Sequence, residues 1–298
     1  MNESEESFVI KHHIGVIGGS GLYEMPGLSE VREQLVSTPF GAPSDAIVMG
    51  TFGETRFYFL PRHGRGHRLA PHRVNYRANV YALKSLGARQ LVGISAVGSL
   101  QDHLHPGHLV VVDQFIDRTR GRVSTFFDED VVAHVSMAQP TDTALSFCLG
   151  EAAQQEGAQV HRAGTYVCME GPQFSTRAES LLHRSLKADV IGMTNLPEAK
   201  LAREAELPYA SLCFVTDYDA WHDTEEAVSV EAVLAVLRKN VALAQRILQR
   251  VQSWPRPDDS PAASALAHAI ITDPRFITQA PRERLGLLIS KYLPVEAP

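Results

Sequence analysis

The sequence predicts an α/β protein with a mixed, largely parallel central sheet flanked by helices and a short C-terminal helical extension. Short runs rich in β-branched residues alternate with segments whose apolar residues recur at helical spacing, which is typical of a parallel sheet covered by helices. The chain has 298 residues, 44% of them hydrophobic, so it can bury a large core. No apolar run reaches the roughly 18 residues that a membrane helix needs, and the composition excludes disordered and collagen-like proteins.

The elements of the first third follow from local patterns. Strands are predicted at 14–17, 46–49 and 56–60, where apolar and β-branched residues cluster. A helix is predicted over 74–86, because its apolar residues recur at helical spacing and Gly87 is placed to end it.

The rest of the chain continues the alternation. Strands are predicted at 90–94, 109–112, 160–169, 189–191 and 210–215, with helices at 143–156, after Pro172, at 197–206 and at 229–251. The small residues 95–99 are expected to form a turn. A segment rich in proline, aspartate and serine, 253–263, precedes a helical segment over about 266–293. We therefore divide the chain into a tail (1–12), a main domain (13–253) and a linker with C-terminal extension (254–298), which packs on the same domain or on a neighbouring subunit.

Charge and cysteine content narrow the class of protein further. The net charge is −6, which argues against binding to nucleic acid through phosphates. The three cysteines, at 148, 168 and 213, form no C-x-x-C pair, as expected in a reducing compartment. The acidic N-terminus lacks the apolar core of a secretory signal, so we expect a cytoplasmic protein.

Three segments at predicted strand ends could bind an anion. The first, Gly-Gly-Ser-Gly, contains Ser20; the second contains Arg62 and His63; the third contains Ser95 and Ala96. Backbone N–H groups, hydroxyls and a guanidinium all suit phosphate, and ligands of parallel sheets sit at strand carboxyl ends. Each segment also has a plainer interpretation, as a tight turn, a solvated basic loop or the end of a strand.

A pair of carboxylates follows the predicted strand 210–215. Asp217 and Asp219 could bind a metal, cap a helix or accept hydrogen bonds from a substrate, and Tyr218 and Trp221 beside them would suit a flat ligand. Phe174, Met193 and Thr194 are core and capping residues when they are interpreted alone.

The histidines at 103, 105 and 108 form an H-x-H-x-x-H pattern. No cysteine or dense carboxylate set accompanies them, so we favour a polar loop over a metal site. No nucleophile elbow of the form G-x-S-x-G occurs.

Taken in order, many long segments resemble the methylthioadenosine-cleaving branch of the trimeric purine nucleoside phosphorylases. They include GVIGGSGLYEMPGL, LPRHGRGHRLAPHRVNYRANVYALKSLG, ISAVGSL, VVVDQFIDRT, MEGPQFSTRAES and DVIGMTNLPEAKLAREAELPYASLCFVTDYD. The resemblance covers residues 14–293 and implies a nucleoside phosphorylase fold. It also implies phosphate-dependent cleavage of methylthioadenosine to adenine and 5-methylthioribose 1-phosphate, in methionine and purine salvage. Inorganic phosphate would be a co-substrate, with no cofactor and no metal.

The same resemblance implies a role for individual residues. Positions matching the phosphate site are Ser20, Arg62, His63, Ser95, Ala96 and Thr194. Phe174 and Met193 match residues that contact base and ribose, and Asp217 and Asp219 match the catalytic residues that face purine N7 and N6. His134 and Val230 match the pocket for the 5′-thiomethyl group, with His134 donated by a neighbouring subunit of a homotrimer or a dimer of trimers. Serines stand at 20 and 95, where threonine is frequent in the family, and Val97 where cysteine often stands.

The chemistry of the residues agrees with this family. A protonated Asp217 can donate to N7 of the leaving purine, and burial beside Asp219 favours that proton. The two carboxylates accept from a 6-amino group, whereas a 6-oxo group would repel them. The alternatives are a purine nucleoside phosphorylase with another base preference (adenosine, inosine, guanosine or methylthioinosine), a hydrolytic nucleosidase, and a non-catalytic nucleoside sensor.

Overall fold

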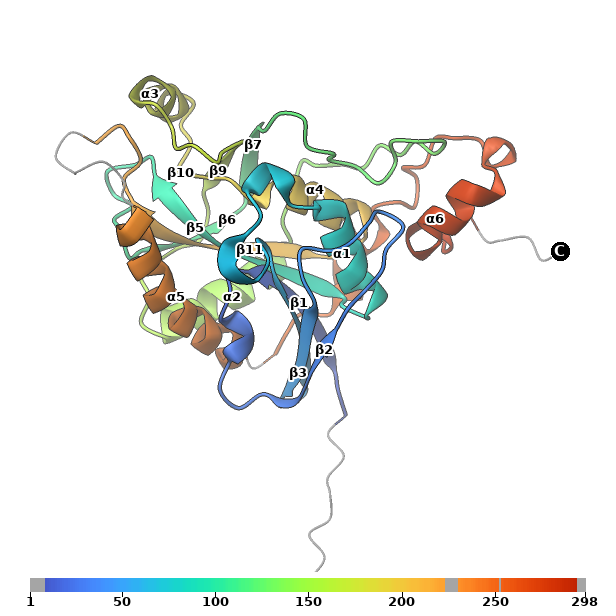
Figure 1. Cartoon of the computed structure of the whole chain (residues 1–298), viewed down its shortest axis with the longest axis horizontal. Coiled ribbons are helices and arrows are strands. Elements are labelled where there is room, and N and C mark those ends of the chain that lie inside the picture. The colour runs from blue at the N-terminus through green and yellow to red at the C-terminus, as the bar shows by residue number, and fades with distance from the viewer. Residues whose placement is uncertain (1–8, 223–229, 252, 294–298) are drawn as a thin grey trace, which may run out of the picture.

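A single twisted sheet forms the centre of the molecule (Figure 1). The computed structural model describes residues 9–222, 230–251 and 253–293. The strands in these ranges are β1 (His12–Gly18), β2 (Ser29–Gln34), β3 (Ile47–Phe52), β4 (Thr55–Pro61), β5 (Gln90–Ser99), β6 (Leu109–Val112), β7 (Gln114–Arg118), β8 (Val160–His161), β9 (Thr165–Met169), β10 (Val190–Gly192) and β11 (Tyr209–Asp217). The order is β2-β3-β4-β1-β5-β10-β9-β7, with β11 paired to β5 and β6, and β8 to β6. Six of the ten strand pairings are parallel, which confirms the predicted mixed, largely parallel sheet.

Helices cover both faces of this sheet. They are α1 (Tyr76–Ser85), α2 (Thr143–Gln155), α3 (Arg177–Ser185), α4 (Asn195–Glu204), α5 (Val230–Arg250) and α6 (Gln279–Ile289). Helices α1 and α4 pack together on one side, and α2 and α5 on the other (Figure 1).

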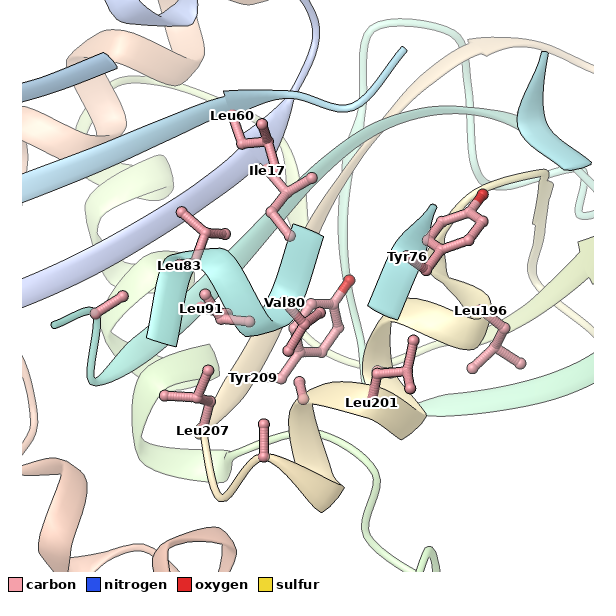
Figure 2. Close-up of a cluster of buried hydrophobic side chains, with 14 of the residues drawn as sticks. Ile17, Leu60, Tyr76, Val80, Leu83, Leu91, Leu196, Leu201, Leu207 and Tyr209 are labelled. Atoms are coloured by element: carbon pink, nitrogen blue, oxygen red, sulfur yellow. The ribbon is translucent and has the colours of Figure 1, made fainter. Parts of the chain in front are cut away.

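Alternation along β1 explains the two-sided core. Ile14 and Val16 are buried with α2 and α5, whereas Ile17 is buried with α1 and α4. Successive side chains of a strand point to opposite faces, so a strand covered on both sides is apolar throughout. Figure 2 shows the second of these clusters, which includes Ile17, Leu83 of α1 and Leu201 of α4.

Local capping explains where the helices begin and end. The side chain of Asn75 accepts a hydrogen bond from the backbone N–H of Ala78 and so begins α1. Asp142 does the same for α2, and Thr176 begins α3 with a complete capping box. Gly87 follows α1 with a φ of 102°, a left-handed conformation that favours glycine, as predicted.

The predicted turn at residues 95–99 is wrong, because β5 continues through them. In this stretch β5 pairs with β11, where Ser95 lies beside Cys213, and with β10, where Ser99 lies beside Val190. Small polar residues are tolerated in this buried strand because neighbouring strands and side chains satisfy them. Pairing across the sheet overrides the local turn preference.

Other boundaries also differ from prediction. The strand predicted at 160–169 is two strands, because the chain leaves β6 after β8 and joins β7 and β10 through β9. Strands β2 and β7 were not predicted; all six residues of β2 are exposed, so its sequence lacks the usual alternation. Within 266–293 the structure has α6 and one short 3₁₀ turn that begins at Pro274, and another such turn begins at Pro261 in the preceding segment.

The C-terminal segment packs on the face of the sheet that α1 and α4 cover. Leu266, Leu285 and Leu288 are buried in the same cluster as Ile17, and Ile270 forms a backbone bridge with Ala133. No helix in the described ranges is long and apolar enough to cross a membrane.

Candidate active site

The three predicted anion-binding segments leave three adjacent strands. β4, β1 and β5 are neighbours in the sheet and run parallel, so their carboxyl ends meet at one edge. Gly18 lies beside Pro61, and the N–H of Arg62 donates to the carbonyl of Gly18 over 2.9 Å. The structure thus brings together the segments that contain Ser20, Arg62 and Ser95. Ser20 is exposed in its turn, and Ala96 is partly buried in β5.

Arg62 is held by an internal ion pair. Its Nε and Nη2 donate to the two carboxylate oxygens of Glu198 over 2.8 and 3.0 Å, and the guanidinium also donates to the carbonyls of Ile94 and Ile17. Burial acts to lower the pKa of Arg62, but Glu198 outweighs it and raises that pKa, so the group stays charged. These bonds leave one Nη1 hydrogen for a ligand. Sequence reasoning missed Glu198, a partner 136 residues away, which no local motif marks.

His63 lies next to this guanidinium, and one of its ring nitrogens already has a hydrogen-bond partner. Its Nδ1 is 2.8 Å from the carbonyl of Leu69, and its ring stacks on His67 with 4.2 Å between centroids. Burial, with the charge of Arg62, lowers the pKa of His63 to about 4. The ring is therefore neutral at pH 7, Nδ1 carries the proton, and Nε2 can accept a hydrogen bond from a protonated phosphate oxygen.

Two buried hydroxyls complete this side of the site. The Oγ of Ser95 donates to Oδ1 of Asn195 over 2.8 Å and lies 3.1 Å from Oγ1 of Thr194. Asn195 in turn donates to the hydroxyl of Ser211, which fixes its orientation. Thr194 precedes α4 without capping it through its side chain, so the hydroxyl points toward Ser95 instead. Asn195 is another residue that the sequence analysis did not single out.

The carboxylate pair lies farther along the same edge, above Gly98. Asp217 ends β11, and Thr216 donates to its Oδ2 over 2.6 Å. A Cβ placed on Gly98 would lie 2.9 Å from Oδ1 of Asp217 and 3.3 Å from Cβ of Asp219, so both residues pack over this glycine. Asp219 is only 7% exposed, and its Oδ2 has no hydrogen-bond partner within the described chain. A buried acceptor without a partner is typical of a ligand site.

Two interpretations of this segment need correction. No helix in the described ranges begins at Asp217 or Asp219, so the helix-cap interpretation is wrong. Trp221 does not offer a face for a flat ligand: it is buried, donates to the carbonyl of Ser99, and lies under the guanidinium of Arg184 at 3.5 Å. The tryptophan anchors the segment instead.

Arg122 connects the segments that follow β9 and β10. Its guanidinium is almost fully buried and donates to the carbonyls of Met193 and Leu196 over 2.8 and 2.9 Å, and to the carbonyl of Glu170. Met193 lies against Gly171 in the loop that leads to Phe174, which is 48% exposed. One buried cation therefore joins the ends of β9 and β10. Nothing in its local sequence distinguishes it from neighbouring arginines.

Within one chain, His134 does not lie at the edge of the sheet where β4, β1 and β5 end. It is exposed, and its N–H donates to the carbonyl of Ala269 in the C-terminal segment. That segment lies on the opposite side of the molecule from α5 (Figure 1). The side chain of Val230, at the start of α5, falls outside the residues whose side chains the structure describes.

The histidine-rich loop packs on itself. Nδ1 of His108 is 3.0 Å from Nε2 of His161, and His105 contacts the hydroxyl of Tyr218. In the described part of the chain, no group of three or more His, Cys, Asp or Glu side chains is arranged to hold a metal ion. The polar loop is the interpretation that this geometry favours.

Comparison with known proteins places the chain in a family. The family model of the phosphorylase superfamily matches residues 13–253. An S-methyl-5′-thioadenosine phosphorylase from Geobacter sulfurreducens is 56% identical over 94% of this chain and 99% of its own, and one from Koribacter versatilis is 51% identical over 94% and 96%. A methylthioadenosine phosphorylase from an antarctic soil metagenomic library superimposes with a TM-score of 0.87 at 48% identity, over 93% of this chain and 98% of its own. The enzyme from Schistosoma mansoni in complex with adenine gives 0.77 at 37% identity, over 94% and 98%. The chain belongs to the phosphorylase superfamily.

Proposed function

We propose that this protein catalyses phosphorolysis of S-methyl-5′-thioadenosine, giving adenine and 5-methylthioribose 1-phosphate. The names of its relatives support this reaction. The observation that carries it in the structure is the buried Oδ2 of Asp219, which has no hydrogen-bond partner within the described residues; Asp219 and Asp217 both pack over Gly98 of β5, one of the strands whose ends hold the anion-binding segments.

Phosphate binds across the ends of β4, β1 and β5 in this proposal. Ser95 and Thr194 supply hydroxyls, Arg62 supplies the remaining Nη1 hydrogen, and the turn at Ser20 supplies backbone N–H groups. His63 orients a protonated oxygen of the anion. No metal and no cofactor is required, because these preorganised donors already hold the charge.

Cleavage then separates charge between ribose and base. An oxygen of the phosphate attacks C1 of the ribose, the C1–N9 bond breaks, and its electron pair moves into the purine. The phosphate dianion stabilises the positive charge on the sugar. Asp217 gives its proton to N7, so the base leaves neutral.

The same pair of carboxylates recognises the base through hydrogen bonds. Ionised Asp219 accepts a hydrogen bond from the 6-amino group, which satisfies the oxygen that lacks a partner in the described chain. A 6-oxo group would place two acceptors against each other. Phe174 and Met193 contact base and ribose.

The active unit is a homotrimer in our proposal. His134 comes from the neighbouring subunit, because within one chain it is tied to the C-terminal segment. Exposed apolar side chains lie on the same two segments of the chain: Val132, Ile271 and Phe276 are 43%, 61% and 75% exposed. A closed head-to-tail ring would cover them and complete each site. We place the enzyme in the cytoplasm, a location that the three free cysteines support.

One assay separates this function from its alternatives. The purified protein is incubated with methylthioadenosine with and without phosphate, and with and without a chelator. We expect adenine release only with phosphate, and no effect of the chelator. Release in phosphate-free buffer would indicate a hydrolytic nucleosidase, binding without release a sensor, and faster turnover of adenosine or inosine another base preference.

A further inference from the structure

A buried polar cluster on α3 lies next to the base-reading carboxylate. Ser180 and His183 are one helical turn apart, and they are 0% and 5% exposed although Leu181 and Leu182 between them face solvent. The Oγ of Ser180, the Nδ1 of His183 and the Oδ2 of Asp219 all lack a hydrogen-bond partner within the described residues. Leaving such atoms unpaired costs free energy, and His183 and Asp219 are the two that can pair with each other as donor and acceptor, so their retention indicates a role that the unliganded chain does not use.

His183 and Asp219 interact electrostatically. Burial lowers the pKa of His183, and the carboxylate of Asp219, its strongest charged neighbour, opposes that effect. The charge of Arg118 on β7 also lowers the pKa of His183, and the charge of Glu179 on α3 also raises it. The imidazole is therefore neutral at pH 7 and offers a single N–H.

The position of α3 relative to the carboxylate is fixed by the next residue. Arg184 lies 3.5 Å from the ring centroid of Trp221 and donates to the carbonyl of Leu100 over 2.7 Å, while Trp221 donates to the carbonyl of Ser99. These contacts hold the segment that carries Asp219 against α3, so the two side chains need only small rotations to form a hydrogen bond.

We propose that His183 is a positioning residue that donates its Nδ1 hydrogen to Oδ2 of Asp219 once a nucleoside is bound. This inference rests on the proposed function. The donated hydrogen bond keeps Asp219 ionised, so that the single proton of the carboxylate pair stays on Asp217, where N7 needs it. It also keeps Asp219 an acceptor, which selects a 6-amino over a 6-oxo purine. Hydrogen bonds of this kind often tighten only in the substrate complex.

The test compares His183→Phe, His183→Gln and the matched control Ser180→Ala, which removes a polar atom from the same helix face. For each, kcat/KM is measured against pH with methylthioadenosine and with methylthioinosine. For His183→Phe we expect kcat/KM for methylthioadenosine to fall about 10- to 100-fold, the range for a hydrogen bond to a charged group. The acid limb of the profile should move up by about one pH unit, and methylthioinosine should gain relative to methylthioadenosine. KM for phosphate should stay the same.

The other two variants test whether the effect is specific to the hydrogen-bond donor of His183. His183→Gln keeps a donor and should show a smaller change, and Ser180→Ala should match wild type. An unchanged pH profile and base preference in His183→Phe, or equal changes in Ser180→Ala, would overturn the role of His183. A wild-type protein that does not release adenine would instead overturn the proposed function.

A second measurement uses the wild type, with His183→Gln serving only to identify the signals of His183 among those of the thirteen histidines. Nitrogen-15 NMR of histidine-labelled wild type with adenine and phosphate reports which ring nitrogen of His183 carries the proton. We expect Nδ1 to be protonated and shifted by adenine. A ring protonated only on Nε2 in the complex would refute the proposal.

Discussion

In the proposed site, the phosphate side and the base side differ in how their polar groups are hydrogen-bonded. On the phosphate side, Arg62, Ser95 and Asn195 already have protein partners: Glu198, Asn195 and Ser211. On the base side, Asp219 and His183 each hold a buried atom without a partner in the described chain. The first side is rigid before any ligand arrives, whereas the second is completed by the purine. Binding of the anion should therefore depend on the packing that holds Arg62 and Ser95 in place. Recognition of the base should depend on which carboxylate of the pair carries a proton.

The largest expected effect is on the base side. Asp217→Ala removes the proton donor to N7 and should lower kcat by about 10² to 10⁴, with little change in KM for phosphate. Asp217→Asn should lose activity on methylthioadenosine but gain, relatively, on methylthioinosine, because its amide can donate to a 6-oxo group. Asp219→Asn should be milder, since it lies farther from the bond that breaks. Steady-state kinetics with both nucleosides check this; an active Asp217→Ala would show that the pair is misassigned.

Removing the ion pair on the phosphate side should cost stability. Glu198→Ala leaves the guanidinium of Arg62 buried without its counter-charge and should lower the free energy of unfolding by about 3–5 kcal/mol. The matched control is Glu54→Ala, which breaks the exposed pair with Lys11 and should cost about 0–1 kcal/mol. Urea denaturation measures both. Equal losses would mean that the ion pair does not hold the phosphate side.

Substitution of Gly98 tests whether the two carboxylates must pack against β5. A Cβ at this position would meet Asp217 at 2.9 Å, so Gly98→Ala should displace the carboxylate, cost about 1–3 kcal/mol of stability and reduce kcat at least tenfold. In α6, Gly286 has open space around it, and Gly286→Ala should stabilise the protein by up to about 1 kcal/mol. Thermal unfolding and kcat are compared; full activity of Gly98→Ala would place the reacting base elsewhere.

The smallest effect should come from a single hydroxyl on the phosphate side. Ser95→Ala removes the hydroxyl that donates to Asn195 in the free protein and turns to the anion on binding, and should raise KM for phosphate by about tenfold, since such a bond is worth about 1 kcal/mol or somewhat more. KM for methylthioadenosine should change less. A reversed pattern would show that the two sides are not separable.

Sequence reasoning found the parts of the molecule that depend on neighbours in the chain. The β-branched strands, the cap at Gly87 and the adjacency of the three strand ends follow from local patterns and from the logic of parallel sheets. It missed β2, which has no buried face, and mistook the end of β5 for a turn, because only pairing with β10 and β11 makes those small residues a strand. The partners Glu198 and Arg122 were also missed. A buried ion pair has no local signature.

The pair of Arg62 and Glu198 has a consequence for the growing polypeptide. The phosphate loops belong to the first hundred residues, yet the carboxylate that holds the guanidinium is 136 positions later, on α4. A nascent chain that stops before α4 carries the loops without their anchor. In the proposed function, the anion site is therefore complete only after α4 has packed against the first half of the chain. A ligand that binds only the folded state stabilises it by mass action, so we expect free phosphate to stabilise the full chain and not a fragment that ends before α4.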